Sequence, residues 1–501
     1  MINRRKFLIS LAQASALPAL ARSIAAAEAL EQKLAADPMR PQFHLLPAAN
    51  WMNDPNGPIY FNGHYHMFYQ YNPNAAVWGD MHWGHAVSRN MIHWRHLPIA
   101  LAPTPGGPDA QGCFTGTAAL QDGKVVLLYT GVRSAPEDAA TIKDGANSLR
   151  ESQCLAVADD ASLITFTKRA QPVIADPPPG IEVSGFRDPS PWPTRDGWFM
   201  TVGSGIRHRH GLVLLYHSTD LRTWQYLHPL AVGSDSGDMW ECPEFFPLGD
   251  KHVLIYSSQG KAHWQTGSLD EREMVFHPQK SGTLDLGSYY APKTQLDKDG
   301  NRILWGWIQE ARPETEYKAA GWACLMSLPR QLTLAEDGGL KIDVAPAVDQ
   351  LRKSRRQVHL TSNDEQNKRE IEALRIEGCC GELLCSVKLP CAAFRLSLAN
   401  SSGQSGSWLD IQYDPNQPDA IQIDSNPIPI PKGQKQIEIH LYVDGSVIEV
   451  FLNRHSAFTR RFYYQAATPP DVHLKWTGTT TDIDDLSIWQ LSPISPNRLT
   501  T

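Results

Sequence analysis

Short runs of β-branched and aromatic residues alternate with turn dipeptides from about residue 50 onward, and few stretches show helical periodicity. Five turns recur in one context, with Asn-Gly, Asp-Gly or Gly-Asp directly before an apolar run: 62–63, 122–123, 196–197, 249–250 and 299–300. Each predicts a β-hairpin, because these residues accept the positive φ of a tight turn. Their glycines are 60, 74, 52 and 51 residues apart. Four short strands per unit of this length are typical of propeller blades, so the pattern predicts a five-bladed β-propeller. A large β-sandwich with coincidental turns is the alternative.

The pattern changes near residue 340. Residues 344–356 are the best candidate for a short helix, and their Arg- and Lys-rich end is typical of a linker. Residues 357–491 alternate apolar and polar positions, and 440–452 form a hairpin pattern around Asp444-Gly445. We therefore expect an all-β protein with a propeller over residues 38–340, a linker over 341–356 and a C-terminal β-sandwich over 357–495.

The N-terminus has the pattern of an export signal over residues 1–29. Adjacent arginines, Arg4 and Arg5, precede a mildly apolar stretch at 8–20 and small residues at 25–27. This order resembles a twin-arginine signal of bacteria. An ordinary secretory signal and a frayed basic helix are the alternatives. We expect the protein to be exported, to the periplasm or the extracellular space.

The composition argues against nucleic-acid binding and against a membrane protein. The 501 residues carry 46 basic and 53 acidic side chains, a net charge of −7, which gives no electrostatic footprint for nucleic acid. After the N-terminus no apolar run is long enough to span a membrane. Tryptophan is unusually frequent, since 15 Trp equal the Tyr and the Phe in number, and 12 of them precede residue 351. The sequence does not determine the oligomeric state.

Metals and cofactors are not expected. The eight cysteines include no Cys-x-x-Cys pair, and the spaced acidic ligands of a calcium loop are absent. Four cysteines cluster at 379, 380, 385 and 391, which suggests a local disulfide of undetermined pairing in an oxidising compartment.

Three acidic residues occupy corresponding places in the repeat: Asp54, Asp188 and Glu241. Equivalent positions of different blades converge on the axis of a propeller, so we expect the three carboxyl groups to face one cavity. Hydrolysis of an acetal needs such a set, because one carboxylate attacks the anomeric carbon while a second, protonated group supplies the leaving oxygen with a proton. We expect Arg187 to keep the neighbouring Asp188 ionised.

Motifs along nearly the whole chain resemble glycoside hydrolase family 32, the family of invertases, inulinases, levanases and related β-fructofuranosidases. They are WMNDPNG at 51–57, FYQYNP at 68–73, WGH at 83–85, FTG at 114–116, FRDP at 186–189, WECP at 240–243, YAPKT at 290–294, ILWGW at 303–307, SLPR at 327–330 and VDGSVIEVF at 443–451. The resemblance implies a five-bladed propeller followed by a β-sandwich, in agreement with the repeat.

The resemblance also implies roles for individual residues. Asp54 resembles the family's nucleophile, Glu241 its general acid/base and Asp188 its transition-state stabiliser, which binds fructose hydroxyls together with Arg187. The residues that resemble the lining of the fructose subsite are Asn53, Gln70, Trp78, Phe114 and Thr115. Thr115 replaces the commoner serine and retains its hydroxyl. We expect Trp51 and Trp83 to form an aromatic wall, and Trp305 and Trp307 to pack in the core.

The function implied is that of a retaining glycoside hydrolase. It would release terminal fructose from β-D-fructofuranosides, either small molecules such as sucrose or oligosaccharides such as short fructans of inulin or levan type. A fructosyltransferase would use the same carboxylates with a sugar as acceptor. A five-bladed hydrolase of arabinan or xylan would lack the WMNDPNG motif, and a non-catalytic sugar-binding protein would not need the three acids.

Overall fold

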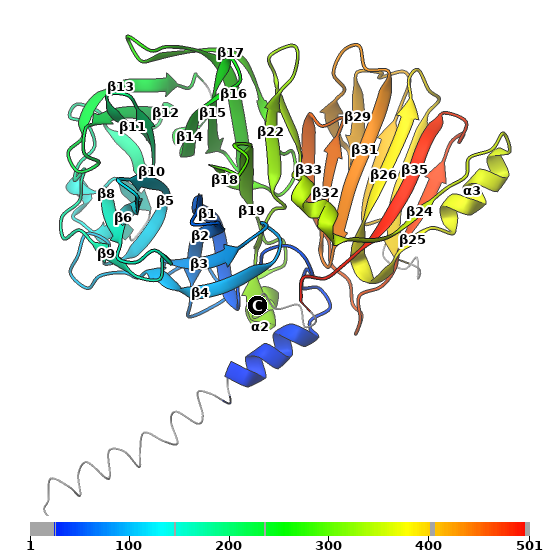
Figure 1. Ribbon diagram of the computed structural model, residues 1–501, viewed down its shortest axis with the longest axis horizontal. Helices are drawn as coiled ribbons and strands as arrows, with labels where there is room; N and C mark the ends of the chain where they lie inside the picture. Colours follow the sequence, from blue (N-terminus) through cyan, green and yellow to red (C-terminus); the bar gives the residue numbers. More distant parts are fainter. Residues whose placement is uncertain (1–24, 26, 145–146, 235–236, 401–405, 496–501) are drawn as a thin grey trace, which may run out of the picture.

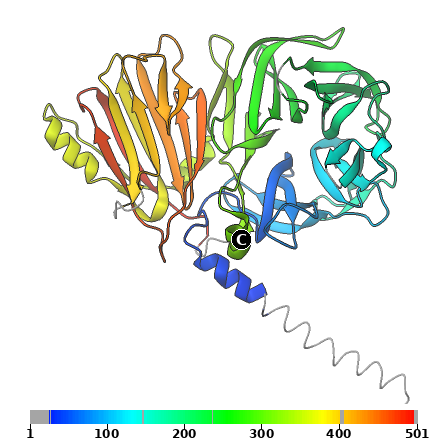
Figure 2. The same ribbon diagram turned by 180° about the vertical axis from the view of Figure 1, so that it is seen from behind.

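The computed structural model describes residues 25, 27–144, 147–234, 237–400 and 406–495. It consists of two all-β parts that lie side by side (Figures 1 and 2). Strand pairing within the described residues gives five sheets over Asn50 to Val344 and two sheets over Arg352 to Leu491. The first part is a propeller and the second a β-sandwich, so the predicted fold class is confirmed.

Each propeller sheet is built from strands that follow one another closely in the sequence. The first contains β1 (Asn50–Phe61), β2 (His64–Asn72), β3 (His82–Ser88), β4 (Trp94–Leu101) and the short parallel strand β20 (Trp322–Ala323). The second contains β5 (Gly112–Gln121), β6 (Lys124–Ser134), β7 (Ile142–Asp144), β8 (Asn147–Ala158) and β9 (Phe166–Lys168). The third contains β10 (Val183–Thr194), β11 (Gly197–Ile206), β12 (His210–Ser218) and β13 (Gln225–Val232).

The fourth sheet contains β14 (Glu241–Leu248), β15 (Lys251–Ser258), β16 (Lys261–Asp270) and β17 (Val275–Thr283). The fifth contains β18 (Tyr290–Leu296), β19 (Arg302–Ile308), β21 (Leu325–Met326), β22 (Arg330–Leu334) and β23 (Leu340–Val344). The first strands of the sheets contact one another in the ring β1–β5–β10–β14–β18–β1. They therefore surround the central axis (Figure 1).

The five turns recognised in the sequence occupy the same place in each sheet. Every one joins the first strand to the second, from β1–β2 to β18–β19. Their glycines have positive φ, from 58° at Gly249 to 128° at Gly197. The repeat in the sequence is therefore the repeat of the blade.

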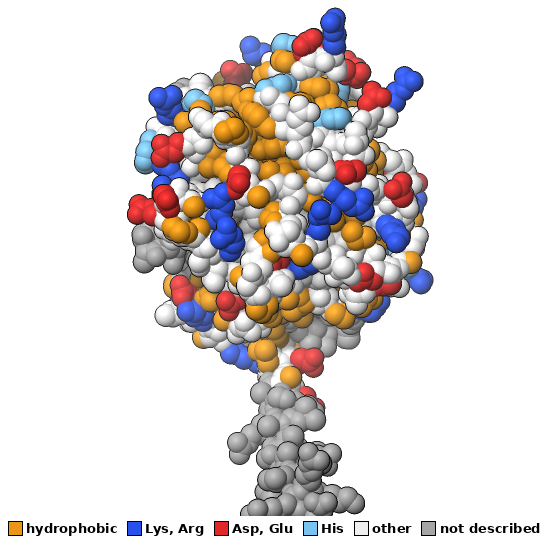
Figure 3. Space-filling view, turned by 90° about the vertical axis from the view of Figure 1, so that its left-hand side faces the viewer, with side chains coloured by type: hydrophobic (Ala, Val, Ile, Leu, Met, Phe, Trp, Pro, Cys, Tyr) orange, Lys and Arg blue, Asp and Glu red, His pale blue; other side chains and the backbone are white. Residues whose placement is uncertain are grey.

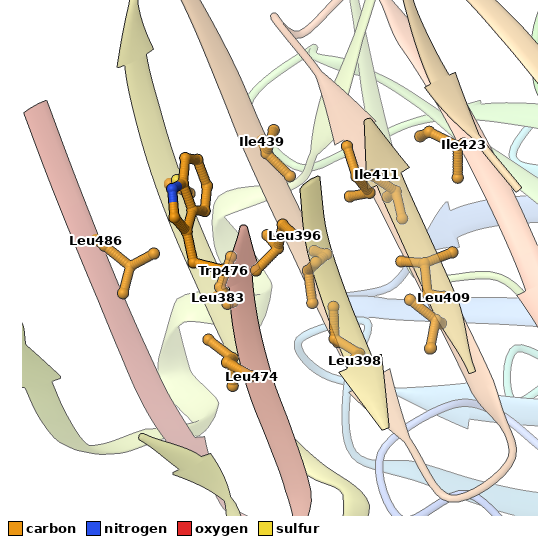
Figure 4. Packing of buried hydrophobic residues seen from close by; sticks show 14 of the residues in the cluster. Leu383, Leu396, Leu398, Leu409, Ile411, Ile423, Ile439, Leu474, Trp476 and Leu486 are labelled. Carbon is orange, nitrogen blue, oxygen red and sulfur yellow. The ribbon is translucent and has the colours of Figure 1, made fainter. Parts of the chain in front are cut away.

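The sandwich packs two six-stranded sheets face to face. One has the order β24 (Arg352–Gln357), β35 (Ile483–Leu491), β26 (Cys380–Lys388), β31 (Gln436–Asp444), β32 (Val447–Leu452) and β33 (Ser456–Arg461). The other has the order β25 (Arg375–Ile376), β34 (Val472–Thr477), β27 (Phe394–Asn400), β28 (Leu409–Tyr413), β29 (Ala420–Ile423) and β30 (Asn426–Pro429). Their inner side chains interdigitate, among them Leu383, Leu396 and Ile439 (Figure 4). Each fully buried aliphatic side chain stabilises the fold by about 1.5–3 kcal/mol.

Helices are few and short. Besides a helix near the N-terminus, the described residues contain α2 (Glu314–Ala320), α3 (Asp364–Glu372) and the 3-10 helices η1 (Glu137–Ala139), η2 (Pro346–Leu351) and η3 (Glu377–Cys379). The side chain of Asn363 caps α3 by accepting a hydrogen bond from the backbone N–H of Gln366.

The stretch 341–356, expected to be a linker, is largely regular structure. It contains most of β23, all of η2 and most of β24, which pairs with β35 at the edge of the sandwich. Two of its basic residues contact an aromatic ring, while Lys353 and Arg356 are exposed: the guanidinium groups of Arg352 and Arg355 lie 4.6 and 5.0 Å from the ring centroid of Trp489. Their aliphatic stems and planar heads suit them to cover an aromatic ring.

The cysteine cluster does not form the local disulfide that the sequence suggested. Cys385 and Cys391 are free and buried. The thiols of Cys379 and Cys380 donate hydrogen bonds to the carbonyl oxygens of Pro470 and Leu491. These side chains therefore serve as small apolar residues of the sandwich.

The predicted export signal at 1–29 lies almost wholly outside the described residues. Residues 27–36 form a helix, and Leu34 packs with Trp322 and Val447 where propeller and sandwich meet. Among the helices of the described part of the chain, none is long and apolar enough to cross a membrane. Acidic and basic side chains are interspersed over the propeller side shown in Figure 3.

Buried charges join the propeller to the sandwich. Glu310, just after β19, forms an ion pair of 2.7 Å with Arg312 and lies 3.8 Å from Arg461 of β33. Burial alone would raise the pKa of Glu310, but Arg461 and Arg312 outweigh it and lower the pKa to about 2. Both parts of the chain thus supply charges to one network.

Candidate active site

The first strand of every blade carries a β-bulge at the end that faces the cavity. The ladder is interrupted between Met52 and Pro55 in β1, Phe114 and Gly116 in β5, Arg187 and Ser190 in β10, Glu241 and Glu244 in β14, and Tyr290 and Lys293 in β18. A bulge re-aims a side chain without ending the strand. Asp54, Thr115 and Asp188 lie within these interruptions, and Glu241 and Tyr290 lie directly before them, so every blade contributes to the cavity.

The sequence explains why the strands bulge there. Proline follows closely in four of the five blades, at 55, 189, 243 and 292, and its missing N–H costs no ladder hydrogen bond at a bulge. Asp188, Cys242 and Ala291 have φ of 66°, 50° and 50°, a left-handed conformation that is uncommon outside glycine. The surrounding strands hold these residues in it.

All three predicted carboxylates line one cavity of about 320 Å³. The other lining residues are Asn53, Gln70, Trp78, Phe114, Thr115, Ile142, Leu149, Arg187, Cys242, Tyr290 and Trp307. The structure therefore brings together every residue predicted for the site except Trp51 and Trp83.

Asp54 is held by neutral donors. Its carboxylate accepts hydrogen bonds from Thr115 Oγ1 at 2.6 Å and from Asn53 Nδ2 at 2.9 Å. Gln70 Nε2 in turn donates to Thr115 Oγ1 at 2.6 Å, which fixes the direction of the hydroxyl. Burial raises the pKa of Asp54, while the bonds from Thr115 and Asn53 oppose the rise. These two donors thus favour the ionised form that a nucleophile needs.

Asp188 does not behave as the sequence suggested. Its Oδ2 accepts the backbone N–H of Cys242 at 2.8 Å, but Arg187 turns to other carboxylates. Burial is the largest effect on the pKa of Asp188, and the charge of Glu241 adds to it. Together they outweigh the opposing charge of Arg187 and raise the pKa to about 7. The charge of Arg187 acts on Asp188 in the expected direction, but burial outweighs it, and the guanidinium group donates its hydrogen bonds to Glu151 and Glu241.

Glu241 is bound on both oxygens. Arg187 donates to Oε1 from Nη2 at 2.9 Å and from Nε at 3.2 Å, while the hydroxyl of Tyr290 donates to Oε2 at 2.5 Å. Arg187 Nη1 also donates to the buried Glu151 at 2.7 Å. The Glu241 side chain nevertheless keeps 29% of its surface exposed. It therefore remains open to substrate while its orientation is fixed.

The aromatic wall differs from the one expected. Trp83 is fully buried and donates to the carbonyl oxygen of Phe114 at 3.0 Å. Trp51 lies behind the cavity, where its Nε1 donates to Asn53 Oδ1 at 2.8 Å. The rings that line the cavity are Trp78, Phe114, Tyr290 and Trp307, and Trp78 is 56% exposed. Trp307, expected in the core, belongs to the wall, whereas Trp305 is buried as expected.

Five residues of the site and its surroundings were missed by sequence reasoning: Glu151, Tyr290, Cys242, Ile142 and Leu149. Tyr290 and Cys242 had a signal, since they belong to the motifs that occupy the bulge position. Ile142 and Leu149 come from β7 and β8, whose sequences give no such sign. In the part of the chain that the structure describes, no group of three or more His, Cys, Asp or Glu is arranged to hold a metal ion.

Comparison with known proteins identifies the family. The model for "Glycosyl hydrolases family 32 N-terminal domain" matches residues 44–346, and that for "Glycosyl hydrolases family 32 C terminal" matches residues 347–490. The chain belongs to glycoside hydrolase family 32. It is a glycosidase of the β-fructofuranosidase class.

Relatives of the family 32 chain match over nearly its full length. It is 35% identical over 486 residues to a sucrose-6-phosphate hydrolase of Escherichia coli, which covers 90% of this chain and 94% of the relative. A Bombyx mori β-fructofuranosidase variant solved with sucrose has a TM-score of 0.74 at 27% identity, with 94% of this chain and 98% of that one covered. A variant of fructan 1-exohydrolase IIa of Cichorium intybus solved with 1-kestose has a TM-score of 0.77 at 25% identity, with 91% and 98% covered.

Proposed function

We propose that this family 32 chain hydrolyses β-D-fructofuranosides with retention, with Asp54 as nucleophile, Glu241 as general acid/base and Asp188 as transition-state stabiliser. The observation that carries the proposal is the convergence of the three carboxylates, each on a different blade, in one cavity. Retaining hydrolysis needs one ionised and one protonated carboxyl group. The third carboxyl group can stabilise the positive charge of the transition state.

The hydrogen bonds of Asp54 and the exposure of Glu241 support these roles. Asp54 is held by neutral donors that favour its ionised form, as a nucleophile requires. Glu241 keeps exposed surface and two fixed oxygens, as suits a group that gives a proton to a leaving oxygen and later takes one from water. Asp54 attacks the anomeric carbon while Glu241 protonates the departing oxygen; a water deprotonated by Glu241 then cleaves the fructosyl–Asp54 ester and releases fructose.

The substrate class is a small fructoside. The cavity is small, about 320 Å³, and Trp78 lies exposed at its edge, which favours release of terminal fructose from sucrose and short fructans of inulin or levan type. The solved relatives that hold sucrose and 1-kestose support the same class.

We also propose that residues 1–29 direct export of the protein from the cytoplasm as a twin-arginine signal.

Incubation with sucrose, inulin and levan, followed by sugar chromatography, tests the proposal. We expect free fructose, with sucrose or short chains as the better substrates. Free fructose from none of the three would overturn it. Oligosaccharides as the main product at high sucrose would instead favour a fructosyltransferase.

A further inference from the structure

The sandwich touches the backbone that leads to Tyr290. Its edge strand β33 runs beside the propeller segment 285–288, which directly precedes β18. Leu286 N–H donates to the carbonyl oxygen of Ala457 at 3.0 Å, and Ser288 N–H to that of Thr459 at 2.8 Å. A propeller segment thus covers the edge of the sandwich sheet and satisfies its hydrogen bonds.

Side chains reinforce this contact. Asp285 accepts the backbone N–H of Thr459 at 2.9 Å and its hydroxyl at 2.6 Å. Arg330 donates to Asp285 at 2.9 Å and to Glu449 of β32 at 2.5 Å, and all three charged side chains are fully buried. The guanidinium group lies 4.2 Å from the ring centroid of Tyr289. Buried charges with several partners define a geometry sharply, because any displacement leaves a charge unpaired.

The fit at Gly287 leaves no free space. A Cβ atom at this residue would lie 1.8 Å from the carbonyl oxygen of Thr459. No larger residue is compatible with this approach of segment 285–288 to β33. Only two residues separate Gly287 from Tyr290, and consecutive side chains of an extended chain point to opposite sides. Tyr289 faces Arg330, so Tyr290 faces the cavity and Glu241.

We propose that the sandwich strand β33 positions Tyr290, and through it the carboxyl group of Glu241, so that the sandwich is part of the catalytic unit. Thr459 and Gly287 are positioning residues, since neither lines the cavity. The inference rests on the proposed role of Glu241 as general acid/base. It predicts that a defect at the propeller–sandwich contact impairs proton donation to the leaving group.

Gly287→Ala tests this in the full-length chain. Hydrolysis of sucrose depends on proton donation by Glu241, because its sugar leaving group is a poor one. Hydrolysis of p-nitrophenyl β-D-fructofuranoside depends on it little, because the nitrophenolate leaves without a proton. We expect kcat/KM for sucrose to fall on the order of tenfold more than kcat/KM for the aryl fructoside. Equal losses for the two substrates would overturn the proposal, because a smaller folded fraction lowers both alike.

Two further variants make the test specific. In a Tyr290→Phe background the hydrogen bond to Glu241 is gone, so Gly287→Ala should add little to the selective loss for sucrose; fully additive effects would contradict the inference. Leu409→Ala creates a cavity in the far sheet of the sandwich and should lower the melting temperature without changing the ratio of the two kcat/KM values. A changed ratio in Leu409→Ala would count against a local mechanism.

Thr459→Val is the milder variant if Gly287→Ala does not fold. It keeps the backbone contact and removes the hydroxyl that Asp285 and Arg330 bind. The same ratio should change in the same direction, and Thr459→Ser should restore it; an unchanged ratio in Thr459→Val would overturn the proposal. Wild-type protein that releases fructose from neither substrate would instead refute the proposed function itself.

Discussion

Thr115→Val removes one oxygen from the centre of the hydrogen-bond chain at the nucleophile. The hydroxyl donates to Asp54 at 2.6 Å and accepts from Gln70 at 2.6 Å. Valine has nearly the same shape, so packing around the fully buried position is conserved. The substitution therefore isolates the hydrogen bond, apart from leaving the Gln70 amide without this acceptor.

The magnitude follows from the type of bond. A hydrogen bond to a charged group contributes about 1.5–3 kcal/mol. Lost from the ionised nucleophile, it disfavours ionisation of Asp54 by that amount, so kcat/KM falls roughly 10- to 150-fold on the acid limb, where Asp54 is largely protonated.

The pH dependence should change as well. The pKa of Asp54 is already raised by burial, and Thr115 opposes that rise. Without the hydroxyl the pKa rises further, so the acid limb of the kcat/KM profile moves to higher pH and the loss is greatest in acid.

Initial rates of fructose release from sucrose across the pH range measure both effects. Thr115→Ser is the matched control, since serine keeps the hydroxyl, and it should retain most of the activity and the wild-type acid limb. A Thr115→Val enzyme with wild-type kcat/KM and an unmoved acid limb would refute the assignment of Asp54 as an ionised nucleophile held by Thr115.

Three other outcomes are expected. Asp54→Ala and Glu241→Ala should each abolish most turnover with a near-native melting temperature; wild-type-like activity in either would exclude its catalytic role. Arg330→Met should lower the free energy of unfolding by about 3–5 kcal/mol in urea titrations, because buried Asp285 loses its cationic partner and Glu449 keeps only His44. Glu310, with its pKa lowered to about 2 from 4.5, adds stability above pH 4.5 that is lost as the pH falls toward 2. Glu310→Gln should therefore flatten the acid loss of stability in that window, and an unchanged slope would contradict the ion pair.

Local signals predicted most of the fold. Turn chemistry at the five first hairpins predicted the blades, because Asn, Asp and Gly are needed wherever φ is positive, as at Gly63 and Gly123. The linker at 341–356 could not be predicted correctly in the same way. Its basic residues look like those of a linker in the sequence, and only the fold pairs them with β35 and places Trp489 beside Arg352 and Arg355.

The candidate site was predictable where the chemistry is carried by motifs. Asp54 and Asp188 each directly precede the proline of the motif, whereas Glu241 lies one residue earlier, because Cys242 is the residue of β14 that corresponds to Asp188. The repeat still predicted that the three carboxylates face one cavity, since all lie at or beside the bulge of an inner strand. The hydrogen-bond partners of Arg187 could not be predicted from the sequence. Its neighbour in the chain is Asp188, but the guanidinium group donates to Glu151 and Glu241. The same holds for tryptophan: frequency indicated an aromatic wall, but which face a given ring takes depends on the twist of its strand.

The bulges explain why a stable propeller can carry so many buried charges at its axis. An inner strand such as β14 pairs on one side only, with β15, so alternate backbone N–H groups lie outside the ladder, and alternate side chains point into the packing between blades. A bulge frees backbone donors and turns one side chain toward the axis. Cys242 shows the result: its N–H, released at the bulge of β14, donates to Asp188 of the neighbouring blade. At β14 the bulge thus lies beside the catalytic group Glu241 and supplies a hydrogen bond that holds Asp188.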